Sequence, residues 1–396
     1  MEPTTLVLII ILFAITIAPV ISRYTHLPVI VIELIIGIII GKSFLDIIPS
    51  NTLFDFFSSF GLIFLMFLAG LEMDFARIRE SFTRTVVIAV FSISVPFFSG
   101  YFIAQYIGIH PLILGAVIST TSLGLILPIT KELKHHKELS TVLFGSVILI
   151  DILSIFILTF SIVYIRGDFG ITFYYSILLL LVLFILPIVL NRSNVRKRIA
   201  KWLGERSRFA IMVRLSFALL VMLAAVSEEL GFHSIVGAFI AGLIISEITP
   251  KACQLEEKLE SFGYGFFIPF FFILVGSRID IPSLFTNLAN IRMLFIILGI
   301  ALFSKFISVT LASKAVNFNW KESISMGFFH TARLSLIIAV AEIGRELGLV
   351  DDDLFSSFMI IAIISAIIGP VIGKYILKSD EAGRFRKTGP EKVRDS

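Results

Sequence analysis

The chain has very little cysteine and little charge. Cys253 is its one cysteine in 396 residues, so an internal disulfide is impossible and a cysteine metal site is not expected. Asp, Glu, Lys and Arg together make up 16% of the chain, whereas soluble domains average about 25%. This shortage of charge excludes a soluble protein.

A cleavable leader is also missing. The first apolar stretch, at 6–21, follows Met1 and Glu2 without a basic segment and lacks a small-residue cleavage site, so we expect a retained helix. Hydrophobic residues make up 57% of the chain and form long runs rather than the alternation of barrel strands. The sequence therefore predicts an all-α polytopic membrane protein.

Short polar breaks divide the apolar runs into 13 predicted transmembrane helices. They span 6–21, 28–41, 56–71, 85–107, 112–129, 139–164, 171–190, 209–226, 233–248, 262–276, 293–312, 323–343 and 354–377. Lys and Arg gather in alternate loops, above all at 191–208, and such an excess marks the cytoplasmic side. The N-terminus is thus expected outside and the C-terminus inside.

The two halves of the chain contain matching motifs. The segment 67–74 resembles 273–280, and 115–127 resembles 327–339. The first pair of matching segments ends the third and the tenth predicted helices, which are seven steps apart, an odd number, and this predicts the two inverted-topology repeats typical of secondary transporters. We expect repeat one at about 1–165, a linker helix and basic loop at about 166–208, repeat two at about 209–378, and a disordered polar tail at 379–396.

Asp151 lies within an apolar run at 145–156. A charge at mid-bilayer depth costs about 2.5–3.5 kcal/mol on insertion scales, so such residues normally face inward and serve ion or proton pathways. A buried carboxylate can hold either a proton or a small cation. We predict Asp151 as the site for which the two compete, with a purely structural interhelical bond as the alternative.

Hydroxyl residues interrupt two predicted helices at corresponding places in the repeats. One interruption is at 119–122, near Gly124 and Pro128, and the other is at 330–335. Paired interrupted helices expose carbonyl groups and indicate a transporter's binding site, although Ser and Thr in membrane helices usually bond the preceding turn. The candidate ligands beside Asp151 are Thr120, Thr121, Ser122 and Ser335, with Ser154 and Thr331 as secondary candidates.

Further charged residues lie at membrane depth. Lys305 is predicted to be a second proton carrier or a charge partner, with a structural contact to unwound carbonyls as the alternative. Arg333 is expected to support the second broken helix electrostatically. Glu33 and Glu342 are secondary candidates for the ion site; Glu33 is expected at a helix–helix contact, and Glu342 is expected to pair with Arg345.

Small residues recur at close-packing spacing at 37 and 41 and at 238 and 242. Such spacings bring two helix backbones together. From the sequence, the contacts are either within one chain or between two copies.

As a set, these residues resemble the monovalent cation/proton antiporter superfamily over about 6–377, most closely the bacterial sodium/proton antiporters and Kef-type potassium/proton exchangers. The matching motifs are at 27–41, 67–72, 121–122, 237–242 and 269–272, with Asp151, Lys305 and Arg333. The resemblance implies a sodium/hydrogen exchanger-type transmembrane domain at 1–378 and a homodimer with a dimerisation panel and a six-helix core. It also implies crossed discontinuous helices five and twelve, Asp151 as the exchanged-ion carboxylate, and an elevator-type shift of the core.

Two positions depart from that family's pattern. Ile150 stands where Asp, Asn or Gln is common, and Ser335 stands where Glu is common. With Asp151 as the available carboxylate, electroneutral one-for-one exchange of sodium and protons is expected. The chain has no glycine-rich nucleotide-binding motif after its last helix, which favours sodium over potassium.

Three alternatives compete with a sodium/proton antiporter. The nearest is a Kef-type potassium/proton exchanger, which has the same fold. A cation channel leaves the inverted repeat and Asp151 less well explained, and an intramembrane hydrolase lacks a metal-spaced partner for His330. We expect no enzyme activity, no cofactor beyond the transported ions, and no nucleic-acid partner. The predicted setting is the lipid of a prokaryotic inner (plasma) membrane.

Overall fold

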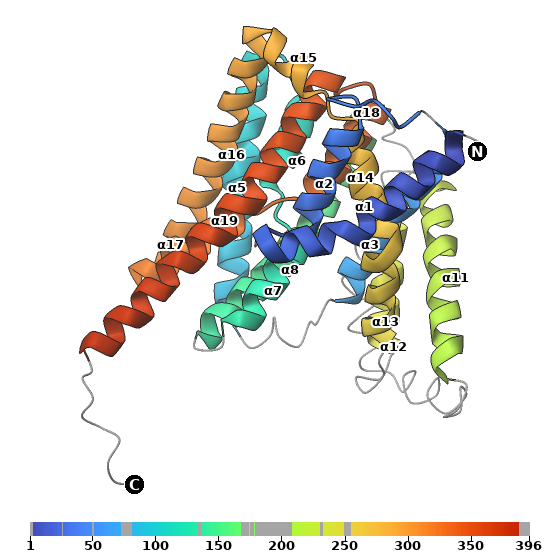
Figure 1. The fold of residues 1–396 in the computed structure, drawn as a ribbon. Helices are drawn as coiled ribbons and strands as arrows, with labels where there is room; N and C mark the ends of the chain where they lie inside the picture. Colours follow the sequence, from blue (N-terminus) through green and yellow to red (C-terminus); the bar gives the residue numbers. More distant parts are fainter. Residues whose placement is uncertain are drawn as a thin grey trace. The chain divides into compact units, whose positions relative to one another are not determined.

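The computed structural model describes residues 3–25, 27–49, 51–72, 81–133, 136–167, 208–229, 233–248 and 255–387, together with Tyr174 and Leu178. All regular elements in these ranges are helices (Figure 1). Within the same ranges, 9 helices are long and apolar enough to cross a membrane, and two shorter apolar helices accompany them. The protein is therefore an all-helical, multi-pass membrane protein, as the sequence predicts.

Each predicted helix except 171–190 coincides with helical residues in the structure. That segment and the basic loop at 191–207 fall outside the described ranges, apart from Tyr174 and Leu178. The total of 13 helices, the repeat arrangement and the orientation of the termini therefore stay predictions.

The chain forms two compact units, and each takes segments from both halves of the sequence. Unit 1 comprises Met1–Ala76, Ile155–Ile291 and Glu342–Met359, and unit 2 comprises Arg77–Ser154, Arg292–Ala341 and Ile360–Ser396. Sequence repeats and compact units are thus different divisions of the same chain.

Unit 1 is built largely from helices of the first and third quarters of the chain. Its elements are α1 (Pro3–Thr25), α2 (Val29–Ile40), α3 (Thr52–Leu71), α11 (Arg208–Glu229), α12 (Ser234–Ile248), α13 (Leu255–Phe262), the π-helix η1 (Gly263–Phe267), α14 (Ile268–Ser277) and α15 (Ile281–Thr286). Phenylalanine rings of α3 pack on those of η1 and α14; the centroids of Phe57 and Phe270 lie 4.7 Å apart. This aromatic contact fills the space between the helices.

Small residues allow two helix pairs of unit 1 to approach closely. A Cβ atom on Gly37 of α2 would lie 2.2 Å from the Ile273 carbonyl oxygen of α14. Likewise, a Cβ atom on Gly242 of α12 would lie 2.0 Å from the Phe67 carbonyl oxygen of α3. The small-residue spacings seen in the sequence therefore serve contacts within one chain.

The predicted helix 262–276 is longer and less regular than expected. It runs from α13 through η1 into α14, and Pro269 stands in the first turn of α14. Proline has no N–H and its ring crowds the carbonyl one turn earlier, which accounts for the wider π turn that precedes it.

Unit 2 contains the two interrupted helices. Its elements are α5 (Phe82–Ile107), α6 (Pro111–Ser119), α7 (Leu123–Glu132), most of α16 (Leu288–Ala315) and α17 (Trp320–Thr331). A capping box starts α17: the Asn319 side chain accepts from the Glu322 N–H at 2.9 Å, and the Glu322 carboxylate accepts from the Asn319 N–H at 3.2 Å. Pro111 occupies the first turn of α6, where no N–H is needed.

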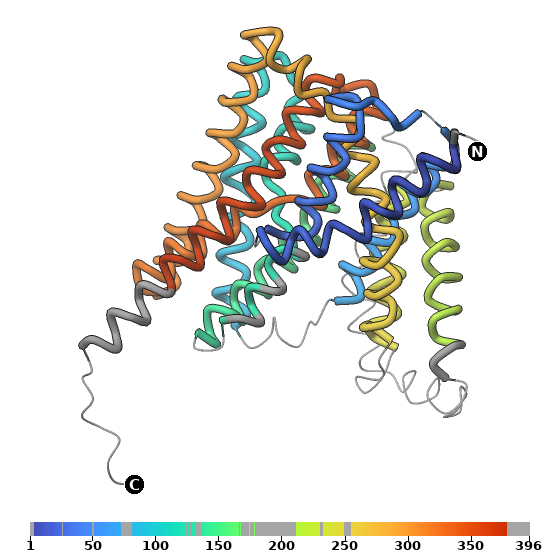
Figure 2. The backbone as a smooth tube through the Cα atoms, viewed as in Figure 1, coloured from blue at the N-terminus to red at the C-terminus, as the bar shows by residue number. Residues whose placement is uncertain are grey.

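Three further helices belong to both units: α8 (Lys137–Arg166), α18 (Ser335–Glu346) and α19 (Asp352–Lys387). The backbone of α19 runs without interruption in Figure 2. This helix continues past 378, where the sequence predicts a disordered tail, because Glu381, Ala382 and the basic residues that follow are good helix formers. Positions 388–396 lie outside the described ranges.

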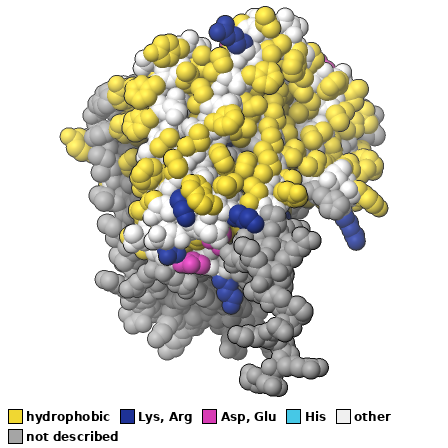
Figure 3. All heavy atoms as spheres, turned by 90° about the vertical axis from the view of Figure 1, so that its left-hand side faces the viewer, with side chains coloured by type: hydrophobic (Ala, Val, Ile, Leu, Met, Phe, Trp, Pro, Cys, Tyr) yellow, Lys and Arg dark blue, Asp and Glu magenta, His cyan; other side chains and the backbone are white. Residues whose placement is uncertain are grey.

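Apolar side chains cover the outward faces of the long helices. In α16, Phe295, Phe303, Ile307 and Leu311 are all exposed. Figure 3 shows a face on which hydrophobic side chains form a broad band, with Lys and Arg mainly towards its margins. Such a band is what lipid-facing helices require.

Candidate functional site

Both predicted interruptions are present as short extended segments. Residues 120–122 separate α6 from α7, and 332–334 separate α17 from α18. Thr120 has ψ 159° and Ala332 has ψ 113°, both far from helical values. Each break leaves backbone N–H and carbonyl groups without partners inside their own helix.

The two breaks contact each other in unit 2. The Ser122 N–H donates to the Ala332 carbonyl at 3.0 Å, and the Thr121 hydroxyl donates to the His330 carbonyl at 3.3 Å. The hydroxyl oxygens of Ser122 and Ser335 lie 3.0 Å apart. These bonds satisfy part of the polar backbone that the breaks expose, and they bring three of the predicted site residues together: Thr121, Ser122 and Ser335.

Two buried cations bind the carbonyl end of α6. Lys305 Nζ donates to the Ser119 carbonyl, and Arg333 Nη1 donates to the Ile118 carbonyl at 2.8 Å. Arg333 Nη2 reaches the Ala301 carbonyl of α16 at 2.7 Å, and neither cation is exposed. Positive charge at a helix C-terminus is stabilised by the helix dipole. The contact of Lys305 is the carbonyl contact given above as its structural alternative.

Asp151 lies on α8 and is 4% exposed. Asp151, Lys305 and Arg333 belong to the same unit. Ser154 follows Asp151 three positions later, so both side chains share one helix face. The buried Ser154 hydroxyl has no hydrogen-bond partner within the described ranges. This face of α8 therefore offers a carboxylate and an uncommitted hydroxyl.

The remaining hydroxyl candidates divide into two kinds. Thr120 donates to the Val117 carbonyl at 3.0 Å, and Thr331 donates to the Phe328 carbonyl at 2.7 Å, so both bond their preceding turn. Thr121 bonds across the breaks instead. A hydroxyl that donates a hydrogen bond still has lone pairs with which its oxygen can bind a cation. The two kinds of hydroxyl therefore differ in the direction in which they are held, and neither kind is excluded as a ligand.

The two secondary carboxylates belong to unit 1. Glu33 is a buried residue of α2. Glu342 accepts from Arg278 Nη1 at 2.8 Å, whereas Arg345 pairs with Asp352 at 2.9 Å. The predicted Glu342–Arg345 pair is therefore wrong. Arg278 at the end of α14 supplies the partner of Glu342, and Arg345 turns to the acidic first turn of α19.

Buried hydrogen bonds beside the second break involve residues that were not among the predicted site residues. His330 Nδ1 lies 2.9 Å from the Met326 carbonyl, and its Nε2 lies 2.9 Å from the Ser146 hydroxyl of α8. The Ser365 hydroxyl of α19 donates to the Arg333 carbonyl at 3.2 Å. Ser146 and His330 are 184 positions apart, so no local spacing reveals the pair.

Comparison with known proteins gives a family match over nearly the whole chain. The sodium/hydrogen exchanger transmembrane family matches residues 8–379. The chain is 32% identical over 384 residues to a "Probable Na(+)/H(+) antiporter 3" of Methanocaldococcus jannaschii, covering 95% of this chain and 97% of the relative. It is 28% identical over 353 residues to the "Na(+)/H(+)-K(+) antiporter GerN" of Bacillus cereus, covering 88% and 89%.

Among solved structures, the fold is similar to that of the sodium proton antiporter MjNhaP1 from Methanocaldococcus jannaschii. The TM-score is 0.66 at 15% identity, and the match covers 95% of this chain and 99% of that chain.

Proposed function

Because the chain belongs to the sodium/hydrogen exchanger family, we propose that it exchanges a monovalent cation, sodium in first place, for protons. The family and the prokaryotic relatives are consistent with a multi-pass protein of a prokaryotic plasma membrane. The observation that supports the proposal most directly is Asp151, a carboxylate buried in the same compact unit as two touching broken helices.

Competition at Asp151 is the proposed basis of exchange. In a dry site an isolated carboxylate is unfavourable, so it takes up a proton or binds a cation. Hydroxyl oxygens of Thr121, Ser122, Ser154 and Ser335 are the proposed replacements for the cation's water ligands. Because Asp151 cannot hold both at once, uptake of one ion requires release of the other.

Alternating access by an elevator-type shift is the proposed mechanism of translocation. Unit 2 contains Asp151, Lys305 and both breaks, so it is the proposed moving core, and unit 1 is the proposed panel of a homodimer. The inverted repeat is supported by equivalent glycines: Gly70 of α3 packs on α12 as Gly276 of α14 packs on α2. Such symmetry is typical of transporters with a midplane site.

Potassium is the proposed alternative cation. GerN, one relative, has both sodium and potassium in its name, and nothing in the hydroxyl set at the breaks excludes the larger ion. Proton flux in proteoliposomes, titrated with sodium, lithium, potassium and rubidium, separates the two proposals. The sodium proposal predicts that sodium or lithium gives half-maximal proton flux at a lower concentration than potassium or rubidium does.

Replacing the central carboxylate tests the function itself. Asp151→Asn keeps the size of the side chain and removes its ionisation, so cation-dependent proton flux should fall to the background of empty liposomes. Glu257→Gln, an exposed acid-to-amide change on α13, is the matched control and should leave flux unchanged. Coupled flux in Asp151→Asn with wild-type cation dependence would contradict the mechanism.

A further inference from the structure

We name residues 342–359 the strap. Their contacts place them in unit 1, but the helix at each end of the strap continues into unit 2. Positions 335–341 of α18 lie in unit 2 and its last turn lies in unit 1. The first part of α19 lies in unit 1 and the rest in unit 2. Since both helices continue across the boundary, a shift of unit 2 relative to unit 1 displaces the strap.

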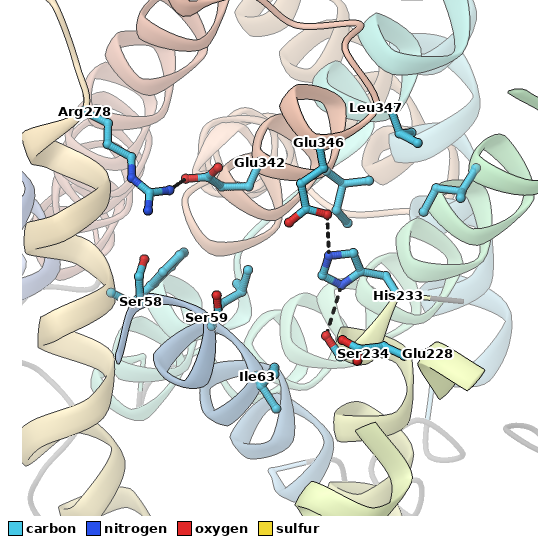
Figure 4. Close-up of a pocket in the computed structure, with 14 residues that line it drawn as sticks. Ser58, Ser59, Ile63, Glu228, His233, Ser234, Arg278, Glu342, Glu346 and Leu347 are labelled. Carbon is cyan, nitrogen blue, oxygen red and sulfur yellow. Dashed lines mark hydrogen bonds and ion pairs between the residues drawn. The ribbon is translucent and has the colours of Figure 1, made fainter. Parts of the chain in front are cut away.

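Ion pairs bind the first half of the strap to α14 and α12. Arg278, at the end of α14, donates to Glu342 of the strap at 2.8 Å and to Asp55 at 2.9 Å. His233 Nε2 lies 3.4 Å from a carboxylate oxygen of Glu346. Figure 4 shows Arg278 pointing towards Glu342, and His233 pointing towards Glu346.

Hydrogen bonds bind the second half of the strap to α15 and its neighbours. Asp353 accepts from the Ser283 hydroxyl at 2.7 Å and from the Asn290 amide at 2.8 Å. The Asp280 N–H donates to the Ser356 hydroxyl at 3.1 Å. The strap is therefore attached along its whole length.

The strap also forms one wall of a cavity of about 370 Å³ within unit 1. Glu342 and Glu346 line it on the strap side, and Ser59 and Ile63 of α3 line it on another. Ser59 is already exposed and Ile63 is half-buried, so displacement of the strap removes this wall and increases the access of solvent to Ile63.

We propose that the strap is a latch that closes one membrane face, the predicted outer one, and that Arg278 is its main positioning residue. The proposal rests on the proposed alternating access. The ion pairs of Glu342 and Glu346 hold the strap on unit 1, and they must break before the strap can leave the wall of the cavity. Arg278 touches none of the ligands proposed around Asp151; it contacts Glu342, and through it acts on the position of α18.

Thiol labelling measures the latch without requiring transport. In a Cys253→Ser background, Ile63→Cys introduces one thiol into the cavity lining, and a membrane-impermeant maleimide is added outside intact cells. Loss of a hydrogen bond to a charged group changes the equilibrium constant between the attached and the displaced strap by about ten-fold. Arg278→Gln should therefore raise the labelling rate about ten-fold, and Arg278→Lys should give a smaller increase.

Arg345→Gln is the matched control. Its ion pair with Asp352 has the same length as the Arg278 contacts but lies inside the strap, so labelling should stay at the wild-type rate. If Arg278→Gln does not reach the membrane, Glu342→Gln removes the same pair from the strap side and should raise the rate equally.

Unchanged labelling in Arg278→Gln or Glu342→Gln, or equal acceleration by Arg345→Gln, would overturn the latch. These outcomes are separate from failure of the proposed function, which shows as retained flux in Asp151→Asn. Loss of flux in Asp151→Asn together with unchanged labelling refutes the latch alone.

Discussion

Arg333 is a fully buried guanidinium whose hydrogen bonds go to backbone carbonyls. It donates to carbonyls of α6 and α16 and, at 3.4 Å, to the carbonyl of Thr331 in its own chain segment. A planar guanidinium can serve three directions at once, whereas an ammonium on a flexible stem cannot match this geometry. Arg333 thus ties the break after α17 to two other helices.

Arg333→Lys should fold but lose stability. At least one buried carbonyl would be left without a donor, and such a loss costs about 1–3 kcal/mol. Thermal unfolding of the purified protein in detergent measures the effect. Arg345→Lys, which keeps its charge near Asp352 at the surface, should change the unfolding temperature far less. An equal change in both variants would contradict the importance assigned to the Arg333 bonds.

His110 lies between α5 and α6, outside the membrane-spanning segments. Burial lowers the pKa of His110 below its ordinary value of 6.5, because desolvation disfavours the charged imidazolium. The unfolded chain therefore binds this proton more readily than the folded protein. Stability is unaffected well above pH 6.5 and decreases as the pH falls through 6.5 towards the lower folded pKa.

His110→Gln should therefore reduce the loss of unfolding temperature between about pH 7 and pH 5. The comparison is made by thermal unfolding of wild type and variant at the same series of pH values. An unchanged slope would show that His110 does not contribute to acid sensitivity.

Single charged residues in apolar runs are the part of the site that sequence reasoning could find. Asp151, Lys305 and Arg333 each stand out because charge is costly in a membrane. Their partners do not stand out, since they are backbone carbonyls or distant side chains. The Arg278–Glu342 pair joins residues 64 positions apart, and local spacing instead indicated the incorrect pair with Arg345.

At the scale of elements, close helix contacts determine which glycines are essential. Gly37 faces the backbone of α14, so an added Cβ would lie 2.2 Å from a carbonyl oxygen that cannot move without the whole helix. Gly299 of α16 has open space around its Cβ position. The two glycines therefore respond differently to the same added methyl group.

Gly37→Ala should destabilise the protein by about 1–3 kcal/mol through overpacking. Gly299→Ala is the matched control and should be neutral or stabilising by about 0.5–1 kcal/mol, because alanine is the better helix former. Thermal unfolding of both variants under identical conditions provides the measurement. A stable Gly37→Ala protein would show that α2 and α14 can separate at little cost.

Hydropathy predicted where the helices lie because membrane helices require long apolar runs. Proline and hydroxyl residues predicted the breaks because they weaken the helical hydrogen-bond ladder. The family resemblance implied that the two broken helices cross, but the individual hydrogen bonds between the breaks could not be predicted, since they depend on how the helix ends pack. The π turn of η1 was also missed, because Pro269 alone does not specify where the extra residue is accommodated.

At the scale of the whole molecule, the charge moved per cycle follows from the number of titrating site groups. Ile150 is fully buried and apolar, so Asp151 is the proposed carboxylate of the ion site and one cation should exchange for one proton. Lys305 donates to the Ser119 carbonyl, a contact that requires no transfer of its proton during the cycle.

Active wild-type proteoliposomes on a solid-supported membrane should therefore give no net transport current after a sodium jump. Lys305→Gln, where it retains flux, should also be silent. A current in wild type that disappears in Lys305→Gln would contradict electroneutral exchange and assign a transported proton to the lysine.

The composition of the two units could not be predicted from the sequence. Internal similarity divides the chain into two consecutive halves, but contacts interleave segments of both halves in each unit. Interleaving depends on which helix faces meet, and hydropathy does not distinguish those faces in helices that are apolar all round.

Continuity of α18 from Ser335 to Glu346 has a consequence for the ion concentration at which the protein responds. The apparent affinity for an ion equals the intrinsic affinity scaled by the fraction of molecules in the competent state. Under the proposed latch, substitutions at Arg278 or His233 change that fraction while leaving the coordination chemistry intact. The responsive concentration range can then be tuned without any change in the ligands of the ion.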